Sequence, residues 1–153
     1  MSSSITNAGN ANVSTASATA APAALPAQLP GSMVLLLRLD GLAVATATAL
    51  LYARTGASWW LFAAVWLAPD ISMLGYLAGP CRGARWYNAF HTYFLPLTLG
   101  VLGLLLHADV AVAVALIWAN HIGVDRVLGY GLKHGVGFGW THLGKHLGRH
   151  GRG

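Results

Sequence analysis

The sequence predicts an all-α membrane protein in which four transmembrane helices form an up-down antiparallel bundle behind a disordered N-terminal tail. The chain has 153 residues, of which 56% are hydrophobic and only 8% charged, whereas a soluble domain carries about 25% charged residues. It contains four apolar stretches of about 20 residues, the length that crosses a hydrocarbon core. The connections between them are short, which makes consecutive helices antiparallel neighbours.

The first 32 residues are mainly Ser, Ala, Thr, Asn and Pro, and none of them is charged. Such a tract buries too little apolar surface to offset its ordering entropy, so residues 1–32 are predicted to be disordered. A signal peptide would need a basic start and a strongly apolar central run, and both are missing. The predicted organisation is therefore a tail at 1–32, a helical domain at 33–134 and a C-terminal tail at 135–153.

Each apolar stretch is predicted to be helical, because only a helix satisfies its own backbone in lipid. The predicted spans are 33–53, 58–78, 84–106 and 110–132. Pro69 and Pro96 lie inside the second and third spans and predict kinks there. Small residues that suit close helix packing form a stripe on the fourth span: Ala111, Ala115, Ala119 and Gly123.

Lysine and arginine predict the orientation of the spans. Basic residues on one side are Arg82, Arg85, Lys133, Lys145, Arg149 and Arg152, whereas Arg54 is the basic residue of the other side. Both termini are therefore predicted to be cytoplasmic, in a bacterial cytoplasmic (inner) membrane. The net charge of +5 comes from helix ends and the tail, a distribution that argues against nucleic acid as a partner. Trp86 and Tyr87 fit an interfacial aromatic belt on the cytoplasmic side.

All four acidic residues are Asp, and three of them, Asp40, Asp70 and Asp125, lie inside predicted spans together with His91 and His121. In the predicted topology these residues lie seven or eight positions from the cytoplasmic ends of their spans, with His121 one turn deeper. That places them about 10 Å below the boundary. His121 and Asp125 are four residues apart and share a helix face. The sequence thus predicts one polar layer.

Three interpretations of this layer remain open. The leading one is a structural or interaction network of hydrogen bonds across the helices, with Arg38, Asp40, Asn88 and Arg126 among its members. The second is a divalent, zinc-like metal site formed by His91, His121, Asp125 and Asp70. It would belong to a membrane-embedded hydrolase in which a free carboxylate, Asp70 or Asp40, acts as the base. The third is a proton or small-solute pathway, which would require a homo-oligomer.

The C-terminal tail carries His142, His146 and His150 at four-residue spacing, with Lys145 and Arg149 between them. On a helix these imidazoles would share a face. Gly144 and Gly148 disfavour that helix, so the sequence predicts a loose basic tail near anionic lipid headgroups.

Three polar motifs resemble a known family: LAPDISMLGY at 67–76, YNAFHTY at 87–93, and HIGVDR at 121–126 followed by GYGLK at 129–133. Together they are similar to the small bacterial membrane proteins catalogued as domain of unknown function 4260. The resemblance covers about residues 34–144 and implies an integral membrane protein. The family provides no activity that can be transferred to these residues.

Overall fold

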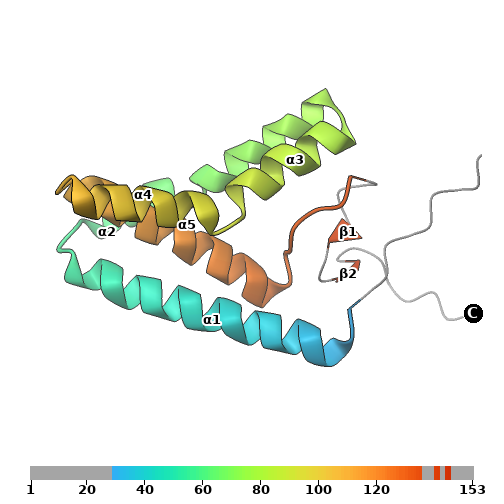
Figure 1. Cartoon of the computed structure of the whole chain (residues 1–153), viewed down its shortest axis with the longest axis horizontal. Helices are drawn as coiled ribbons and strands as arrows, with labels where there is room; N and C mark the ends of the chain where they lie inside the picture. Colours follow the sequence, from blue (N-terminus) through green and yellow to red (C-terminus); the bar gives the residue numbers. More distant parts are fainter. Residues whose placement is uncertain (1–28, 136–139, 142–143, 146–153) are drawn as a thin grey trace, which may run out of the picture.

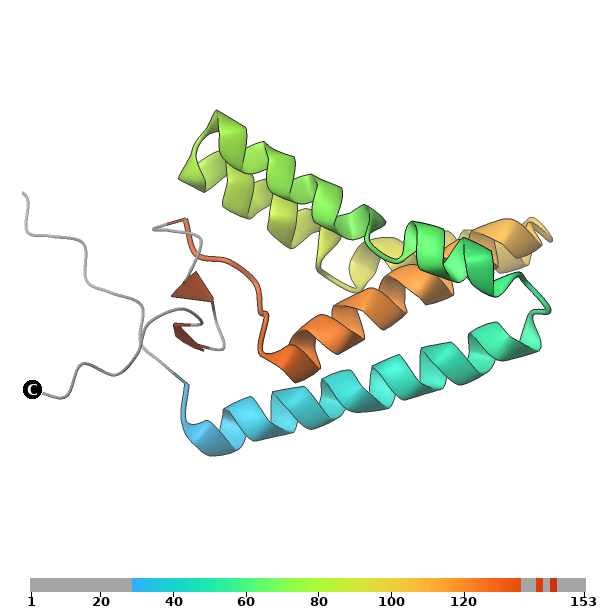
Figure 2. The same ribbon diagram turned by 180° about the vertical axis from the view of Figure 1, so that it is seen from behind.

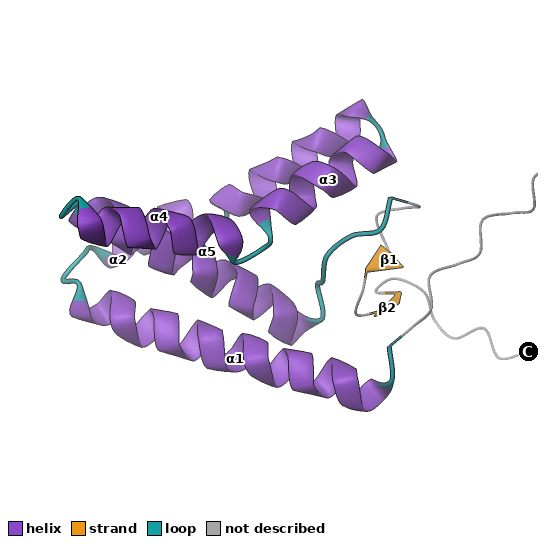
Figure 3. Cartoon of the chain, in the orientation of Figure 1, coloured by secondary structure: helices purple, strands orange, loops and turns teal. Residues whose placement is uncertain are grey.

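The computed structural model describes residues 29–135, 140–141 and 144–145, and this part of the chain is mostly helical (Figure 3). The helical elements are α1 (Gly31–Arg54), α2 (Trp59–Val65), the 3-10 helix η1 (Ala68–Ala78), α3 (Pro80–Phe90), α4 (Phe94–Leu105) and α5 (Asp109–Leu128). Two short strands, β1 (Trp140–Thr141) and β2 (Gly144–Lys145), pair in antiparallel fashion.

Four helical stretches of the described chain are long and apolar enough to cross a membrane, as a multi-pass membrane protein requires: α1, α2 with η1, α3 with α4, and α5. Large apolar side chains cover their outer surfaces. Trp60 is 86% exposed and Leu77 is 88% exposed, values that suit contact with lipid far better than contact with water.

Helix α5 lies at the centre of the arrangement. Helix α1 runs antiparallel along one side of α5, and α4 packs antiparallel along another side (Figure 1). Helices η1 and α3 pack against each other as a hairpin that diverges from α1 (Figure 2). The end of the hairpin opposite its turn meets α5. Four residues of the predicted polar layer, Asp70, His91, His121 and Asp125, lie where this hairpin meets α5.

The second and third spans are each interrupted, whereas the sequence predicted one kinked helix for each. Helix α2 ends before two turn residues, and η1 then continues with Pro69 in its first turn. Helix α3 ends at Phe90, and α4 begins at Phe94 with Pro96 in its first turn. Proline has no N–H to continue the hydrogen-bond ladder of a preceding helix but fits a first turn well. The two prolines therefore restart helices, and the breaks fall beside Asp70 and His91.

The turn between η1 and α3 is shorter than the loop at 79–83 that the sequence predicted. Gly79 alone makes it, with a φ of 106° that favours glycine, and Pro80 opens α3. Close packing holds the hairpin together, since a Cβ on Gly75 would lie 2.9 Å from the Cβ of Trp86 and the ring of Tyr76 lies directly against Gly83.

Two glycines set the contact between α1 and α5. A Cβ on Gly41 would lie 2.5 Å from the Cβ of Arg126 and 2.8 Å from the carbonyl oxygen of Gly123. A Cβ on Gly123 would lie 2.9 Å from the backbone nitrogen of Ala45. The backbones thus approach as closely as small-residue interfaces in membranes allow. Towards the other end of the predicted stripe, Ala115 packs against Gly100 of α4.

Asn120 links three elements in the buried interior. Its amide nitrogen donates to the carbonyl oxygen of Ala45 at 2.7 Å and to the hydroxyl oxygen of Thr48 at 3.3 Å. Its side-chain oxygen accepts from the indole nitrogen of Trp66 at 3.0 Å. One side chain thereby joins α1, α5 and the end of α2.

Replacing this amide is expected to weaken the fold strongly. Asn120→Leu should lower the free energy of unfolding by about 2–4 kcal/mol, because the indole N–H of Trp66 loses its acceptor and two buried hydrogen bonds to α1 are lost. Titration with a denaturing detergent would measure the change. Thr98→Ala is the control, since the exposed Thr98 hydroxyl donates only within its own helix. Equal stability of the two variants would contradict the linking role of Asn120.

Helix α5 ends at Leu128, four residues earlier than predicted, because Gly129 adopts a left-handed conformation with a φ of 88°. The following segment turns back towards α3. There the side chain of Asn88 accepts from the backbone nitrogen of Lys133 at 2.6 Å and donates to its carbonyl oxygen at 2.9 Å. Lys133 also forms a bridge with Thr141.

Parts of both predicted tails lie outside the described residues. This holds for positions 1–28 of the predicted disordered segment and for His142, His146, Arg149 and His150 of the basic tail.

Candidate metal centre

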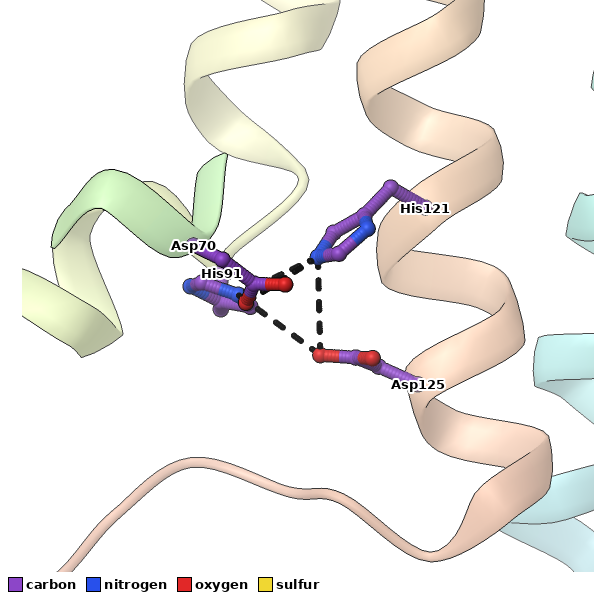
Figure 4. A group of neighbouring side chains, drawn as sticks. All are labelled: Asp70, His91, His121 and Asp125. Atoms are coloured by element: carbon purple, nitrogen blue, oxygen red, sulfur yellow. Dashed lines mark hydrogen bonds and ion pairs between the residues drawn. The ribbon is translucent and has the colours of Figure 1, made fainter. Parts of the chain in front are cut away.

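Four ionisable side chains meet at the junction between the η1–α3 hairpin and α5 (Figure 4). Asp70 comes from the first turn of η1, and His91 is the residue that caps the C-terminal end of α3. His121 and Asp125 come from successive turns of α5. We call these four residues the Asp/His cluster. One ligand atom from each lies within 4.8 Å of the others.

The donor atoms converge on one small volume. The Nε2 atoms of the two histidines are 3.4 Å apart. The Oδ1 of Asp70 lies 3.3 Å from Nε2 of His91 and 3.5 Å from Nε2 of His121. The Oδ2 of Asp125 lies 3.6 Å and 3.8 Å from the same two nitrogens.

These five separations are close to the edge length of a coordination tetrahedron. Ligands at about 2.0–2.2 Å from a tetrahedral ion lie about 3.3–3.6 Å from one another. The five separations between 3.3 and 3.8 Å are close to that range. A nitrogen and oxygen donor set of this kind suits zinc and similar divalent ions. The cluster therefore has the composition and nearly the dimensions of a metal site.

The protonation of His91 strengthens this interpretation. Its Nδ1 lies 2.9 Å from the carbonyl oxygen of Tyr87. A carbonyl only accepts, so this contact places a proton on Nδ1, and a neutral ring with that tautomer would present the lone pair of Nε2. That lone pair faces two carboxylate oxygens and a second imidazole nitrogen. A bound cation satisfies all of these groups together, whereas a proton on Nε2 satisfies one contact at a time.

Packing more than hydrogen bonding orients His121. Its ring is 1% exposed and makes an edge contact with Trp66, at 4.9 Å between ring centroids. Within the described part of the chain, its Nδ1 is buried and has no hydrogen-bond partner. Metal-binding histidines usually donate through their outer nitrogen, so the indole of Trp66 has to hold this ring in place.

Tyr87 and Lys133 complete the surroundings of the cluster, a role that was not predicted from the sequence. Tyr87 is fully buried, its ring stacks on His91 at 3.7 Å between centroids, and its hydroxyl donates to Oδ2 of Asp125 at 3.3 Å. The ammonium of the buried Lys133 lies 5.1 Å from the centre of that ring. Desolvation lowers the pKa of Lys133, while the negative charges of Asp125 and Asp70 act in the opposite direction.

A sequence signal for Tyr87 exists in hindsight. It lies four residues before His91, the spacing that places two side chains on one helix face. Its position beside Trp86 instead suggested an interfacial aromatic belt. No comparable signal pointed to Lys133, since its approach depends on the chain reversing after Gly129.

The other predicted site residues lie outside the cluster. Asn88 forms two hydrogen bonds with the backbone of Lys133. The guanidinium of Arg38 lies against Gly129. Asp40 and Arg126 line a separate cavity of about 180 Å³ between α1 and α5, together with Tyr93. The structure therefore brings together four of the predicted site residues, the members of the Asp/His cluster.

Comparison with known families agrees with the polar motifs. The family model described as a domain of unknown function, DUF4260, matches residues 34–146. The chain belongs to the DUF4260 family. The match includes the Asp/His cluster and the segment that carries Lys133. No curated protein and no solved structure matches this DUF4260 chain significantly.

Proposed function

We propose that this DUF4260 protein binds one divalent transition-metal ion, zinc or an ion of similar preference, through Asp70, His91, His121 and Asp125. The observation that carries the proposal is the convergence of two imidazole nitrogens and two carboxylate oxygens at separations of 3.3 to 3.8 Å. These separations are close to the distances expected of ligands around a tetrahedral ion.

Charge balance supports a divalent ion. Two aspartates inside a membrane-spanning domain would cost several kcal/mol if they stayed ionised without partners. His91 and Asp125 have side-chain exposures of only 3% and 14%, so water offers these groups little stabilisation. Two carboxylates, two neutral imidazoles and one divalent cation carry no net charge. An ion therefore removes most of the penalty for keeping these acids there.

We infer a structural role for the ion. Asp70 and His91 belong to the η1–α3 hairpin, whereas His121 and Asp125 belong to α5. Because both spans that carry the hairpin are interrupted beside these ligands, a shared ion would fix the hairpin against α5. Hydrolysis would need an open coordination position, which four protein ligands leave only if one side chain moves away. The polar-network interpretation is kept here in modified form, with a metal at its centre.

The membrane placement belongs to the same proposal. We infer an up-down arrangement of the four spans in a bacterial cytoplasmic membrane, with both termini cytoplasmic. The supporting observation is the distribution of Lys and Arg. Arg82, Arg85 and Lys133 would lie on the cytoplasmic side and Arg54 on the other. The metal would then be close to the cytoplasmic boundary, and the basic C-terminal tail close to anionic headgroups.

Metal analysis of the purified protein tests the proposal. Protein isolated in mild detergent without a histidine tag should contain about one divalent ion per chain. His121→Ala and the conservative Asp125→Asn should each lose most of that metal. His107→Asn is the matched control, because His107 lies in the loop at the far end of α5 and has a φ of 54° that asparagine tolerates. A chain with His142, His146 and His150 changed to Ala should keep its metal.

Two results would overturn the proposal. The first is wild-type protein that elutes as a single folded species, contains no metal and takes up neither zinc nor manganese. The second is unchanged metal content in both His121→Ala and Asp125→Asn. X-ray absorption at the metal edge adds an independent check, since it should report two imidazoles in the coordination shell.

Removing the Tyr87 hydroxyl is expected to weaken metal binding without abolishing it. Tyr87→Phe should lower metal affinity by about tenfold or more, because a group that holds a ligating carboxylate typically contributes that much. Competition with a chelator dye would measure the affinity. Tyr52→Phe is the control, since its hydroxyl donates to the Ser58 carbonyl, away from the cluster. Equal affinities in the two variants would show that the bond to Asp125 is dispensable.

A further inference from the structure

A second feature, separate from the Asp/His cluster, is a long groove between α1 and α4 with α5 as its floor. Its apolar part is a cavity of about 370 Å³ lined by Val44, Leu97, Val101, Leu104 and neighbouring residues. Along α4 it extends from Tyr93 to Leu104, about 16 Å at about 1.5 Å per residue. Pockets of this size and apolar character accommodate small-molecule ligands.

One end of the groove is polar. Val44 and Tyr93 line both the apolar cavity and the adjacent cavity of about 180 Å³ that contains Asp40 and Arg126. The guanidinium of Arg126 lies 5.7 Å from the centre of the Tyr93 ring. The Tyr93 hydroxyl is buried and lacks a hydrogen-bond partner among the described residues. The groove therefore combines an apolar run with a cation, an anion and an unused hydroxyl at one end.

Asp40 makes this end unusual. It is exposed on the surface of α1, a helix that is long and apolar enough to cross a membrane. No other described residue forms an ion pair with it. An ionised acid inside a spanning segment is costly unless a cation accompanies it, and the ammonium group of a bound ligand would supply that cation.

We propose that the α1–α4 groove binds one phospholipid with a phosphoethanolamine headgroup. The acyl chain would lie along Leu97, Val101 and Leu104. The phosphate would accept hydrogen bonds from Arg126 and from the Tyr93 hydroxyl, and the primary ammonium would pair with Asp40. A headgroup with both charges matches the two charged residues of the polar cavity, whereas a purely anionic headgroup leaves Asp40 without a partner.

Native mass spectrometry of the full-length protein in detergent tests this assignment. The probes are phosphatidylethanolamine, phosphatidylcholine and phosphatidylglycerol with identical acyl chains. Wild-type protein should bind one phosphatidylethanolamine and prefer it about tenfold over both others, the ratio expected from one charge-assisted hydrogen bond. Phosphatidylcholine has no N–H to donate to Asp40, and phosphatidylglycerol has no cation.

Variants assign the binding to the groove. Asp40→Asn should remove the preference for phosphatidylethanolamine over phosphatidylcholine while leaving lipid binding in place, and Arg126→Gln should weaken both lipids. Val44→Trp should block the groove where its polar and apolar parts meet. Its matched control is Leu42→Trp, which places the same ring on an exposed position of the same helix and should bind lipid as the wild type does.

The proposal fails if the wild type binds the three lipids equally or prefers phosphatidylglycerol. It also fails if Val44→Trp binds phosphatidylethanolamine as tightly as Leu42→Trp. Metal content is measured on the same samples. It should stay at the wild-type level in Val44→Trp, so the outcome for the lipid is independent of the outcome for the metal centre.

Discussion

Chelation is expected to lower the melting temperature of the wild-type protein by about 10 °C. An ion present at about 1,000 times its dissociation constant adds about 4 kcal/mol to stability, and each kcal/mol corresponds to about 2–4 °C in a chain of this size. The loss should be reversed by adding back zinc. A fluorescence scan that follows tryptophan would record it, since Trp66 packs directly on His121.

The same scan separates a metal centre from a purely hydrogen-bonded network. If the cluster is only a hydrogen-bonded network, the chelator should leave the melting temperature unchanged, although His91→Ala should still lower the melting temperature. In a metal centre, His121→Ala should melt at the temperature of the chelated wild type and show no further response to chelator. His107→Asn should respond as the wild type does. A variant of the cluster that still loses stability on chelation would contradict the assignment of these ligands.

A side chain at position 41 is expected to disrupt the packing of α1 on α5. Gly41→Val should lower the free energy of unfolding by about 3 kcal/mol or more, the upper part of the range for overpacking. The Cβ atom alone would lie 2.8 Å from the Gly123 carbonyl oxygen. Because backbone lies on the other side of the contact, the helices have to separate to make room.

Gly31→Val provides the control for this prediction. Position 31 begins the same helix, and a Cβ there would have nothing within 4 Å. The β-branched side chain is the same in both variants, so its helix propensity is matched. Detergent-induced unfolding should therefore show a large loss for Gly41→Val and a small one for Gly31→Val. Equal losses would mean that the close approach of α1 and α5 adds little to stability.

Much of the architecture was predictable because lipid imposes simple rules. Helix length, the scarcity of charge and the need to satisfy backbone groups internally led to four spans. Helical spacing placed His121 and Asp125 on one face, and counting from the span ends placed Asp70 and His91 near the same depth. The family resemblance derived from the polar motifs was confirmed by the match to DUF4260 over residues 34–146.

Other features depended on contacts that periodicity does not encode. Counting residues from the span ends predicted the same membrane depth for Asp40 and Asp70. Depth does not determine which side of the helix a side chain lies on, and Asp40 lies in a different cavity from the cluster. The prolines predicted kinks, whereas the chain breaks both helices and aligns the two breaks. The role of Lys133 required the reversal at Gly129, where a φ of 88° ends α5.

The order of the four proposed ligands along the chain has a consequence for biosynthesis. Asp70 and His91 lie in the second and third spans, at least 30 residues before His121 and Asp125 in the fourth. A ribosome makes the first pair before the second exists, so the growing polypeptide carries half a coordination shell until its last helix is translated. Under the proposed metal binding, capture of the ion would be a final event, and a nascent chain that stops short of residue 121 would lack half of the proposed ligands. Metal occupancy would mark the finished molecule for any quality-control system that senses its stability.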